Sequence, residues 1–153
     1  MGQVSHEQAD LLLKLYDLRR EAKLREARSW YMADFQANSP EELLQKYPPN
    51  SSQNAQMRMV IGYWEMACGF VNRGLIDDEM FFESNGEFWF VYEKIRPILP
   101  GLRAMFGNPI AFKHLEAAAG RLEQHWNRVA PGMAEYHRKR LAQMREQAAK
   151  AAH

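Results

Sequence analysis

The sequence predicts an all-α fold: a single-domain, irregular bundle of five to seven helices around a central, buried helix over residues 55–75. Three observations predict it. Residues 55–75 are apolar on most sides at helical pitch, the flanking segments repeat apolar residues in steps of three and four, and several segments begin with a helix-capping residue. With 153 residues, the chain is long enough for one domain, 1–153, with its own core.

The central helix carries two neighbouring lines of apolar side chains. At about 100° per residue these lines cover an arc of roughly 220°, whereas a helix at a protein surface needs an apolar arc of only about 100°. We therefore expect other helices to surround it almost completely. The lines consist of Met57, Ile61, Trp64, Cys68, Val71 and Leu75, and of Val60, Tyr63, Ala67 and Phe70.

A narrow polar strip remains on the central helix, and it contains Arg58, Gly62, Glu65 and Gly69. Glycine in a helix costs roughly 1 kcal/mol relative to alanine, so two glycines on one face predict that another helix backbone approaches the strip closely. Glu65 would then be shielded from water, and an unpaired buried carboxylate is very costly. We expect Glu65 to form an ion pair with an arginine. The candidate partners are Arg28, Arg96 and Arg103.

Helix starts and stops are recognisable in the first part of the chain. Ser5 and Gln8 form a capping box for a first helix. The apolar register shifts around residues 20–23, which predicts either a kink or two short helices. A Ser-Pro pair at 39–40 opens a further short helix, which ends before a loop at 48–54.

The middle of the chain begins with Gly74, which is placed as the left-handed residue that ends the central helix. A short acidic-led turn follows at 77–82. The aromatic run 87–99 fits a helix or a strand, and we favour a helix because no other segment offers a strand partner. Pro97 and the Pro100-Gly101 pair are expected to break that helix.

Two helices are predicted for the last third of the chain. Asn108 and Pro109 open one of them, whose apolar residues alternate in steps of three and four as far as Val129. The other runs from about Met133 to the end, and its apolar line is thin, with charges on every side. We expect residues 133–153 to project from the body or to lie on a partner.

Composition excludes several classes of function. A formal net charge of +1 argues against general polyanion binding, and no sequence-specific nucleic-acid contact is expected. Cys68 is the single cysteine, so we expect neither an intrachain disulfide nor a paired-cysteine zinc site. The sequence shows no secretory signal and no apolar run long enough for a transmembrane segment, which predicts a cytoplasmic protein.

The motifs of common catalytic, cofactor and metal sites are missing from the sequence, namely HExxH, Glu-x-x-His, GxSxG, Walker A and GxGxxG. The adjacent carboxylates at 41–42 and 77–79 stand at predicted helix starts, where the helix dipole stabilises acidic groups. Cys68 lies on the most apolar helix, and burial raises a thiol pKa. We therefore predict no catalytic residue, no metal ligand and no cofactor, and we favour a protein that is not an enzyme.

The tryptophans allow two interpretations. Trp30, Trp64, Trp89 and Trp126 stand one on each major helical segment, which favours a single shared aromatic core. The alternative is a cleft with Glu65 and an arginine on its wall, which would be a small-molecule site. That alternative gives a set of candidate ligand-binding residues and a set of structural glycines. The first set is Trp64, Glu65, Arg96 and Arg103, and the second is Gly62, Gly69 and Gly74.

Three stretches carry a resemblance to a known family. They are Leu-Tyr-Asp-Leu-Arg at 15–19, the Glu65 helix with a glycine at its end, and a stretch with Arg103, Gly107 and Pro109. Over about residues 11–126 the chain resembles a bacterial family of small helical proteins classed as a domain of unknown function. Members often carry an amino-terminal transmembrane helix, which this sequence lacks. The resemblance implies a helical fold and no particular reaction.

Three hypotheses for function follow. The first is a non-enzymatic helical interaction or regulatory module that acts on a protein partner or as a homodimer. The second is a small-molecule-binding sensor, or an uncharacterised enzyme, that uses the Glu65 strip. The third is attachment to an anionic surface, either nucleic acid or membrane, through the basic stretch 137–140 of the last helix.

Overall fold

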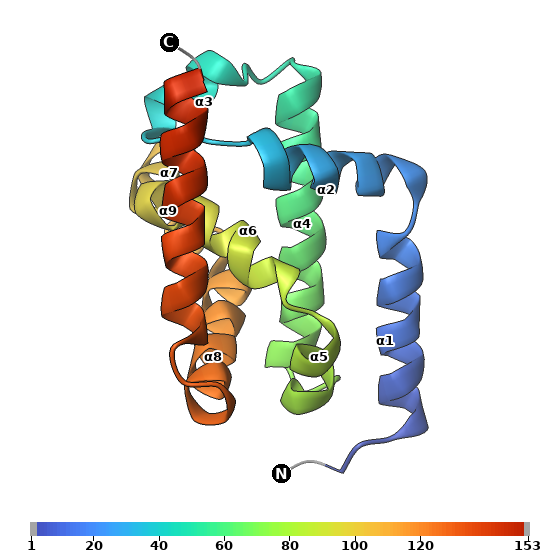
Figure 1. The fold of residues 1–153 in the computed structure, drawn as a ribbon. Coiled ribbons are helices and arrows are strands. Elements are labelled where there is room, and N and C mark those ends of the chain that lie inside the picture. The colour runs from blue at the N-terminus through green and yellow to red at the C-terminus, as the bar shows by residue number, and fades with distance from the viewer. Residues whose placement is uncertain (1–2, 152–153) are drawn as a thin grey trace.

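The computed structural model describes residues 3–151 and shows an all-α fold throughout that range (Figure 1). The helices within residues 3–151 outnumber the expected five to seven because α5, where a turn was expected, and α7, where a break was expected, form helices of their own. In chain order the elements are α1 (His6–Arg19), α2 (Ala22–Asp34), α3 (Pro40–Lys46), α4 (Ser52–Asn72), α5 (Asp78–Ser84), α6 (Glu87–Ile95), the 3-10 turn η1 (Arg96–Ile98), α7 (Leu99–Phe106), α8 (Lys113–Val129) and α9 (Met133–Ala151).

Helix α4 lies at the centre of the fold, where α2 crosses it and α8 packs along it (Figure 1). Val60, Trp64 and Cys68 on its apolar lines have no exposed surface. Full burial of a large apolar side chain contributes about 1.5–3 kcal/mol. The expected central buried helix is confirmed, with two exceptions: Gly62 is exposed, and Leu75 lies beyond the end of α4 and is half exposed.

The register shift after α1 separates two helices and does not kink a single one. Glu21 starts α2 by accepting a hydrogen bond from Leu24 N at 2.9 Å. Its carboxylate satisfies one of the N–H groups that a helix start leaves without a partner. Helix α1 is tied back to α4, because the Tyr63 hydroxyl donates a hydrogen bond to Leu15 O at 2.5 Å.

The aromatic run 87–99 is helical, as expected, and α6 ends at Ile95, two residues before Pro97. Helical structure then continues through η1 and α7. Pro97 lies in η1, and Pro100 lies in the first turn of α7, where a helix tolerates a residue without an N–H donor. The expected break at Pro100-Gly101 is therefore wrong. A Cβ at Gly101 would stand 2.7 Å from Pro40 Cγ, so this glycine allows α7 to approach α3 closely.

Helix α8 begins at Lys113, later than Asn108 and Pro109 suggest. Residues 108–112 are turns or irregular structure, and Phe112 has a left-handed backbone with a φ of 60°. Phe112 also offers α8 no side-chain hydrogen bond. The signal for the start of α8 is therefore not contained in the residues just before it.

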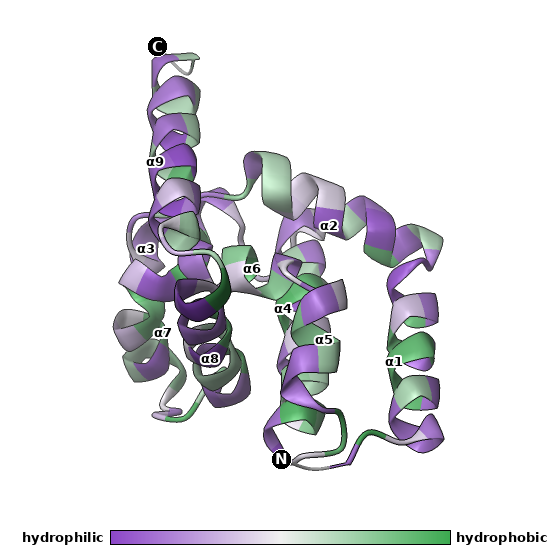
Figure 2. Ribbon diagram, turned by 60° about the horizontal axis from the view of Figure 1, so that its bottom comes forward, coloured by the Kyte–Doolittle hydropathy of each residue, from purple (hydrophilic) through white to green (hydrophobic). Residues whose placement is uncertain are grey.

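Helix α9 contacts the body through its first half. Ala134 is buried, and Arg138 reaches one glutamate on α6 and another on α8. Beyond Arg145 the described residues are exposed, and Figure 2 shows this end of α9 extending past the other helices. We expected residues 133–153 to project from the body, but only the far end of α9 does so. Residues 152–153 lie outside the described range.

The buried apolar side chains belong to one core. The rings of Trp89 and Trp126 lie 5.3 Å apart, Trp64 packs elsewhere in the same core, and Trp30 is partly buried at its edge. The shared-core interpretation of the tryptophans agrees with this arrangement, although Trp89 and Trp126 are the only pair among the described tryptophans whose rings contact each other, at a tilt of 56°.

Candidate ligand-binding groove

Glu65 lies against the start of α8, and its partners are main-chain groups. Its two carboxylate oxygens accept hydrogen bonds from His114 N at 3.0 Å and Leu115 N at 2.7 Å. Residues 3–151 contain no ion pair to Glu65, so the expected arginine pairing is wrong. The free N–H groups and positive dipole end of a helix stabilise a carboxylate. Glu65 of α4 thus caps the start of α8, which the side chain of Phe112 does not.

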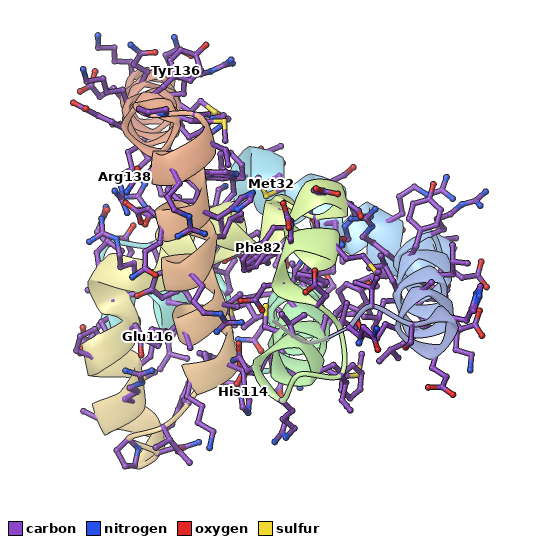
Figure 3. All side chains as sticks on the ribbon, turned by 90° about the horizontal axis from the view of Figure 1, so that it is seen from below. Met32, Phe82, His114, Glu116, Tyr136 and Arg138 are labelled. Atoms are coloured by element: carbon purple, nitrogen blue, oxygen red, sulfur yellow. The ribbon has the colours of Figure 1, made fainter. Side chains whose placement is uncertain are left out.

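The three arginines proposed for Glu65 are paired with other glutamates. Arg28 binds Glu87 on α6 at 2.7 Å, and Arg96 binds Glu93 at 3.1 Å. Arg103 reaches Glu116 at 3.0 Å, and Glu116 points away from the side of α8 on which His114 lies (Figure 3).

Trp64 is fully buried, and its Nε1 donates a hydrogen bond to Glu87 at 3.0 Å. Trp64, Glu65, Arg96 and Arg103 therefore take part in four separate contacts. The structure does not bring them together around one cavity.

The glycines of the strip have different environments. Gly69 is buried, and a Cβ there would stand 2.9 Å from Arg73 Nη1 and 3.4 Å from His114 Cδ2, so the close helix expected at this point is α8. Gly62 is exposed, and a Cβ there would meet nothing within 4 Å. The prediction of close packing at Gly62 is therefore wrong. Gly74 follows α4 with a φ of 78°, a conformation that glycine adopts without strain.

The open space beside Gly62 is a groove between α3, α4 and α7, with a volume of about 570 Å³. Apolar side chains from all three helices form most of its wall, including Leu43 and Leu44 of α3, Met57 and Ile61 of α4, and Leu102 and Phe106 of α7. Leu44 is 36% exposed and Phe106 is 52% exposed. We call this site the α3–α4–α7 groove.

One polar group stands in the wall of the groove. Asn54 is buried, and its Nδ2 donates a hydrogen bond to Tyr47 O at 2.9 Å. The Oδ1 atom of the same amide accepts a hydrogen bond from Arg58 Nε at 2.9 Å. Arg58 is exposed, and it has no ion pair among residues 3–151. Two hydrogen bonds in series therefore hold a guanidinium at the groove without neutralising it.

Part of this site was visible in the sequence. Arg58 and Gly62 are four residues apart on the polar strip of α4, and both line the groove. The opposite wall, formed by α7, could not be predicted from the sequence, because Pro97 and Pro100 indicated that the helix is broken there.

A second hollow, of about 610 Å³, lies where the end of α4 meets α5 and α8, and charged side chains stand among the apolar ones in its wall. Arg121 in this wall makes two hydrogen bonds to the Asp78 carboxylate, at 2.9 and 3.1 Å. These charges satisfy each other. The α3–α4–α7 groove has the more typical lining for a small-molecule site, which is mainly apolar with few polar groups.

Two potentially reactive side chains outside the groove, Cys68 and Lys94, are buried and have structural roles. Burial raises the pKa of the Cys68 thiol, so it is protonated at neutral pH. The ammonium of Lys94 donates to Tyr31 O, Met32 O and Phe35 O at the end of α2, and burial lowers the pKa of Lys94 to about 8. The cavity beside Lys94 is only about 90 Å³, too small for an ordinary ligand.

The described residues form neither a metal-binding cluster nor a membrane-spanning helix. Within residues 3–151, His, Cys, Asp and Glu side chains form no group of three or more that could hold a metal ion. In the same range, no helix combines the length and apolar character that crossing a bilayer requires.

The basic stretch of α9 is partly neutralised by the fold. Arg138 points from α9 toward the body (Figure 3), where it binds Glu123, and its Nη2 also binds Glu93 at 3.0 Å. Lys139 lies 3.5 Å from Glu135. Fewer free cations remain for an anionic surface than the sequence of residues 137–140 suggests.

Comparison with known proteins identifies the domain. A family model described as a domain of unknown function, DUF4760, matches residues 5–126. The chain belongs to this family. No curated protein and no solved structure matches the chain at a significant level.

The DUF4760 region contains the whole α3–α4–α7 groove, because the residues that line it lie between Leu43 and Phe112. It also contains Glu65 and the start of α8. Helix α9 lies outside the matched residues.

Proposed function

We propose that this DUF4760 protein is a non-enzymatic helical binding module that holds a small, mainly apolar molecule in the α3–α4–α7 groove. The observation that carries the proposal is the exposure of apolar side chains around an open space of about 570 Å³. Ligand pockets typically have volumes of about 300–1,000 Å³ and mainly apolar walls. Compared with the sequence-based hypothesis, the small-molecule site lies not at Glu65 but beside Arg58 and Gly62, nearer the start of α4 on the same strip.

Burial of apolar surface would supply most of the binding free energy. Each Å² of apolar surface that a ligand removes from water contributes about 25 cal/mol. Leu44 and Phe106 remain exposed on opposite walls of the groove, so a bound molecule would cover both. Binding to the folded protein alone raises its stability by about 2.7 kcal/mol when the ligand is at a hundred times its dissociation constant.

A pair of glycine variants tests the groove. Gly62 and Gly120 are both exposed helical glycines with nothing within 4 Å of a Cβ, but only Gly62 faces the groove. Decan-1-ol is the probe, and thermal unfolding is the measurement. We expect decan-1-ol to raise the melting temperature of the wild-type protein and of Gly120→Leu. We expect no rise for Gly62→Leu, whose side chain occupies the groove.

Two outcomes would contradict the proposal. If decan-1-ol leaves the wild-type melting temperature unchanged and shifts no amide resonance of α3, α4 or α7, the groove is not a binding site. If Gly62→Leu responds as strongly as Gly120→Leu, the alcohol binds elsewhere on the protein.

The module is proposed to act in the cytoplasm and to pass on its binding state through a protein partner or a homodimer. Leu13 and Leu18 of α1 are 63% and 54% exposed, which supports an interaction through that helix. Sedimentation of the protein over a range of concentrations tests the homodimer. A mass that stays monomeric at every concentration would leave a different protein as the partner.

A further inference from the structure

We propose that the ligand of the α3–α4–α7 groove is an amphipathic monocarboxylate, whose carboxylate binds Arg58 while its hydrocarbon chain lies against the apolar walls. This inference rests on the proposed function and adds the chemical class of the ligand. It is carried by one charged side chain, by the hydrogen bonds that orient it, and by the absence of an acid beside it within the described residues.

The charge of the groove comes from Arg58. Among the described residues that line it, Arg58 alone carries a charge, and the others are apolar apart from Asn54 and Gly62. A guanidinium that has no acidic neighbour attracts an anion from solution. A single positive charge matches a monoanion better than a dianion, which typically requires several cationic or N–H donors.

The orientation of Arg58 is set by Asn54. The Asn54 amide is fixed because its Nδ2 must donate to Tyr47 O, which leaves Oδ1 to accept from Arg58 Nε. Asn54 is only 6% exposed, so few other arrangements are open to it. Arg58 therefore directs its remaining N–H groups away from Asn54, and a guanidinium presents such groups in a fork that fits both oxygens of a carboxylate.

The apolar walls of the groove favour a ligand that carries a hydrocarbon chain. A free inorganic anion or a short acid would leave Leu44 and Phe106 in water and would gain nothing from them. A carboxylate with an alkyl chain places its charge on Arg58 and buries its chain against both side chains. Asn54 is thus a positioning residue, and Arg58 is the residue that contacts the ligand.

Calorimetric titration of the full chain with decanoate and decan-1-ol tests the inference. The two probes have the same chain length and differ in the charged head group. We expect the wild-type protein to bind decanoate at least about tenfold more tightly than decan-1-ol, as a charge-assisted hydrogen bond would provide. In Arg58→Gln the preference for decanoate should disappear, so that the two affinities become equal.

Arg140→Gln is the matched control. It removes the same charge from an exposed arginine of α9, outside the groove, and should keep the preference for decanoate. Equal binding of the two probes to the wild-type protein would overturn the carboxylate assignment and leave the proposed function standing. Failure of both probes to bind would instead remove the proposed function. Tenfold tighter binding of decyl phosphate than of decanoate would overturn the choice of a monocarboxylate.

Discussion

Glu65 accepts hydrogen bonds from two main-chain N–H groups in the first turn of α8, and these groups replace the arginine that the sequence suggested. Both solutions satisfy a partly shielded carboxylate. They differ in the effect of replacing the carboxylate. Replacing it in an ion pair leaves a buried cation without a partner, whereas replacing it in a helix cap leaves only N–H groups without a partner.

Glu65→Gln should therefore lower the free energy of unfolding by only about 1 kcal/mol, because glutamine still accepts one hydrogen bond but loses the favourable charge at the helix start. Urea unfolding measures the change, and Glu83→Gln, at an exposed position of α5, is the control, with an expected change near zero. A loss of more than about 3 kcal/mol would mean that Glu65 has a buried cationic partner.

Gly69 and Gly62 lie on the same strip of α4 and should respond to leucine in opposite directions. At Gly69 the new side chain would press on Arg73 and His114, and overpacking typically costs about 1–3 kcal/mol. At Gly62 the new side chain enters open space, so better helix propensity should stabilise the protein by up to about 1 kcal/mol. The melting temperatures of the two variants test this prediction. Equal changes would show that the packing around Gly62 and Gly69 is the same.

At the scale of elements, α9 is attached to the body by a charged network. The Glu93 side chain is only 4% exposed, and it binds both Arg138 and Arg96. Arg138 also binds Glu123, and hydrogen bonds from Arg138 hold the pKa of Glu123 below its ordinary value. Removal of the whole segment from Arg138 onward would leave Glu93 with Arg96 alone, so a truncation at that point should cost stability.

Arg138→Gln should cost about 2 kcal/mol near neutral pH, because a buried carboxylate loses one of its two charged partners. The pH dependence has a definite sign. Hydrogen bonds from Arg138 lower the pKa of Glu123 in the folded protein, so the ionised Glu123 stabilises the fold above its unfolded pKa and this contribution is lost as the pH falls. The wild-type protein should thus lose its advantage over Arg138→Gln below about pH 4.5.

Urea midpoints of both proteins across the acid range measure that convergence. Lys139→Gln is the control, since Lys139 is 73% exposed at its side chain and should behave as the wild-type protein does. A difference between wild type and Arg138→Gln that stays constant down to the acid limit would show that Glu123 does not depend on Arg138.

At the scale of the whole molecule, the groove exists because α3 and α7 meet. The contact passes through Gly101 and Pro40, which are far apart in the sequence. Helix α4 forms the floor, and the α3–α7 contact sets the distance between the walls. Packing at one glycine therefore controls the shape of a site that this glycine does not line.

Gly101→Ala should weaken decan-1-ol binding and lower stability by about 1–3 kcal/mol. Its Cβ would stand 2.7 Å from Pro40 Cγ, so α7 must shift away from α3, and this strain exceeds the gain in helix propensity. Gly120→Ala, with open space around it, should be neutral or stabilising. Unchanged stability and unchanged binding for Gly101→Ala would show that α3 can yield without altering the groove.

Local patterns in the sequence were enough to predict the class of the fold. Steps of three and four among apolar residues, with Ser5 and Ser39 as caps, define helices because the interactions involved join residues within one or two turns. The same local patterns identified α4 as the buried central helix and Gly74 as the residue that ends it. It also favoured a helix for 87–99, where an aromatic run left a strand as the alternative.

Tertiary structure decided everything that depends on residues distant in the chain. The partner of Glu65 is the backbone at His114, and the start of α8 at Lys113 depends on that same contact. The groove beside Gly62 depends on where α7 lies, and Gly101 places α7 against α3. Sequence periodicity describes one face of one helix at a time, whereas a site between helices is set by which faces meet.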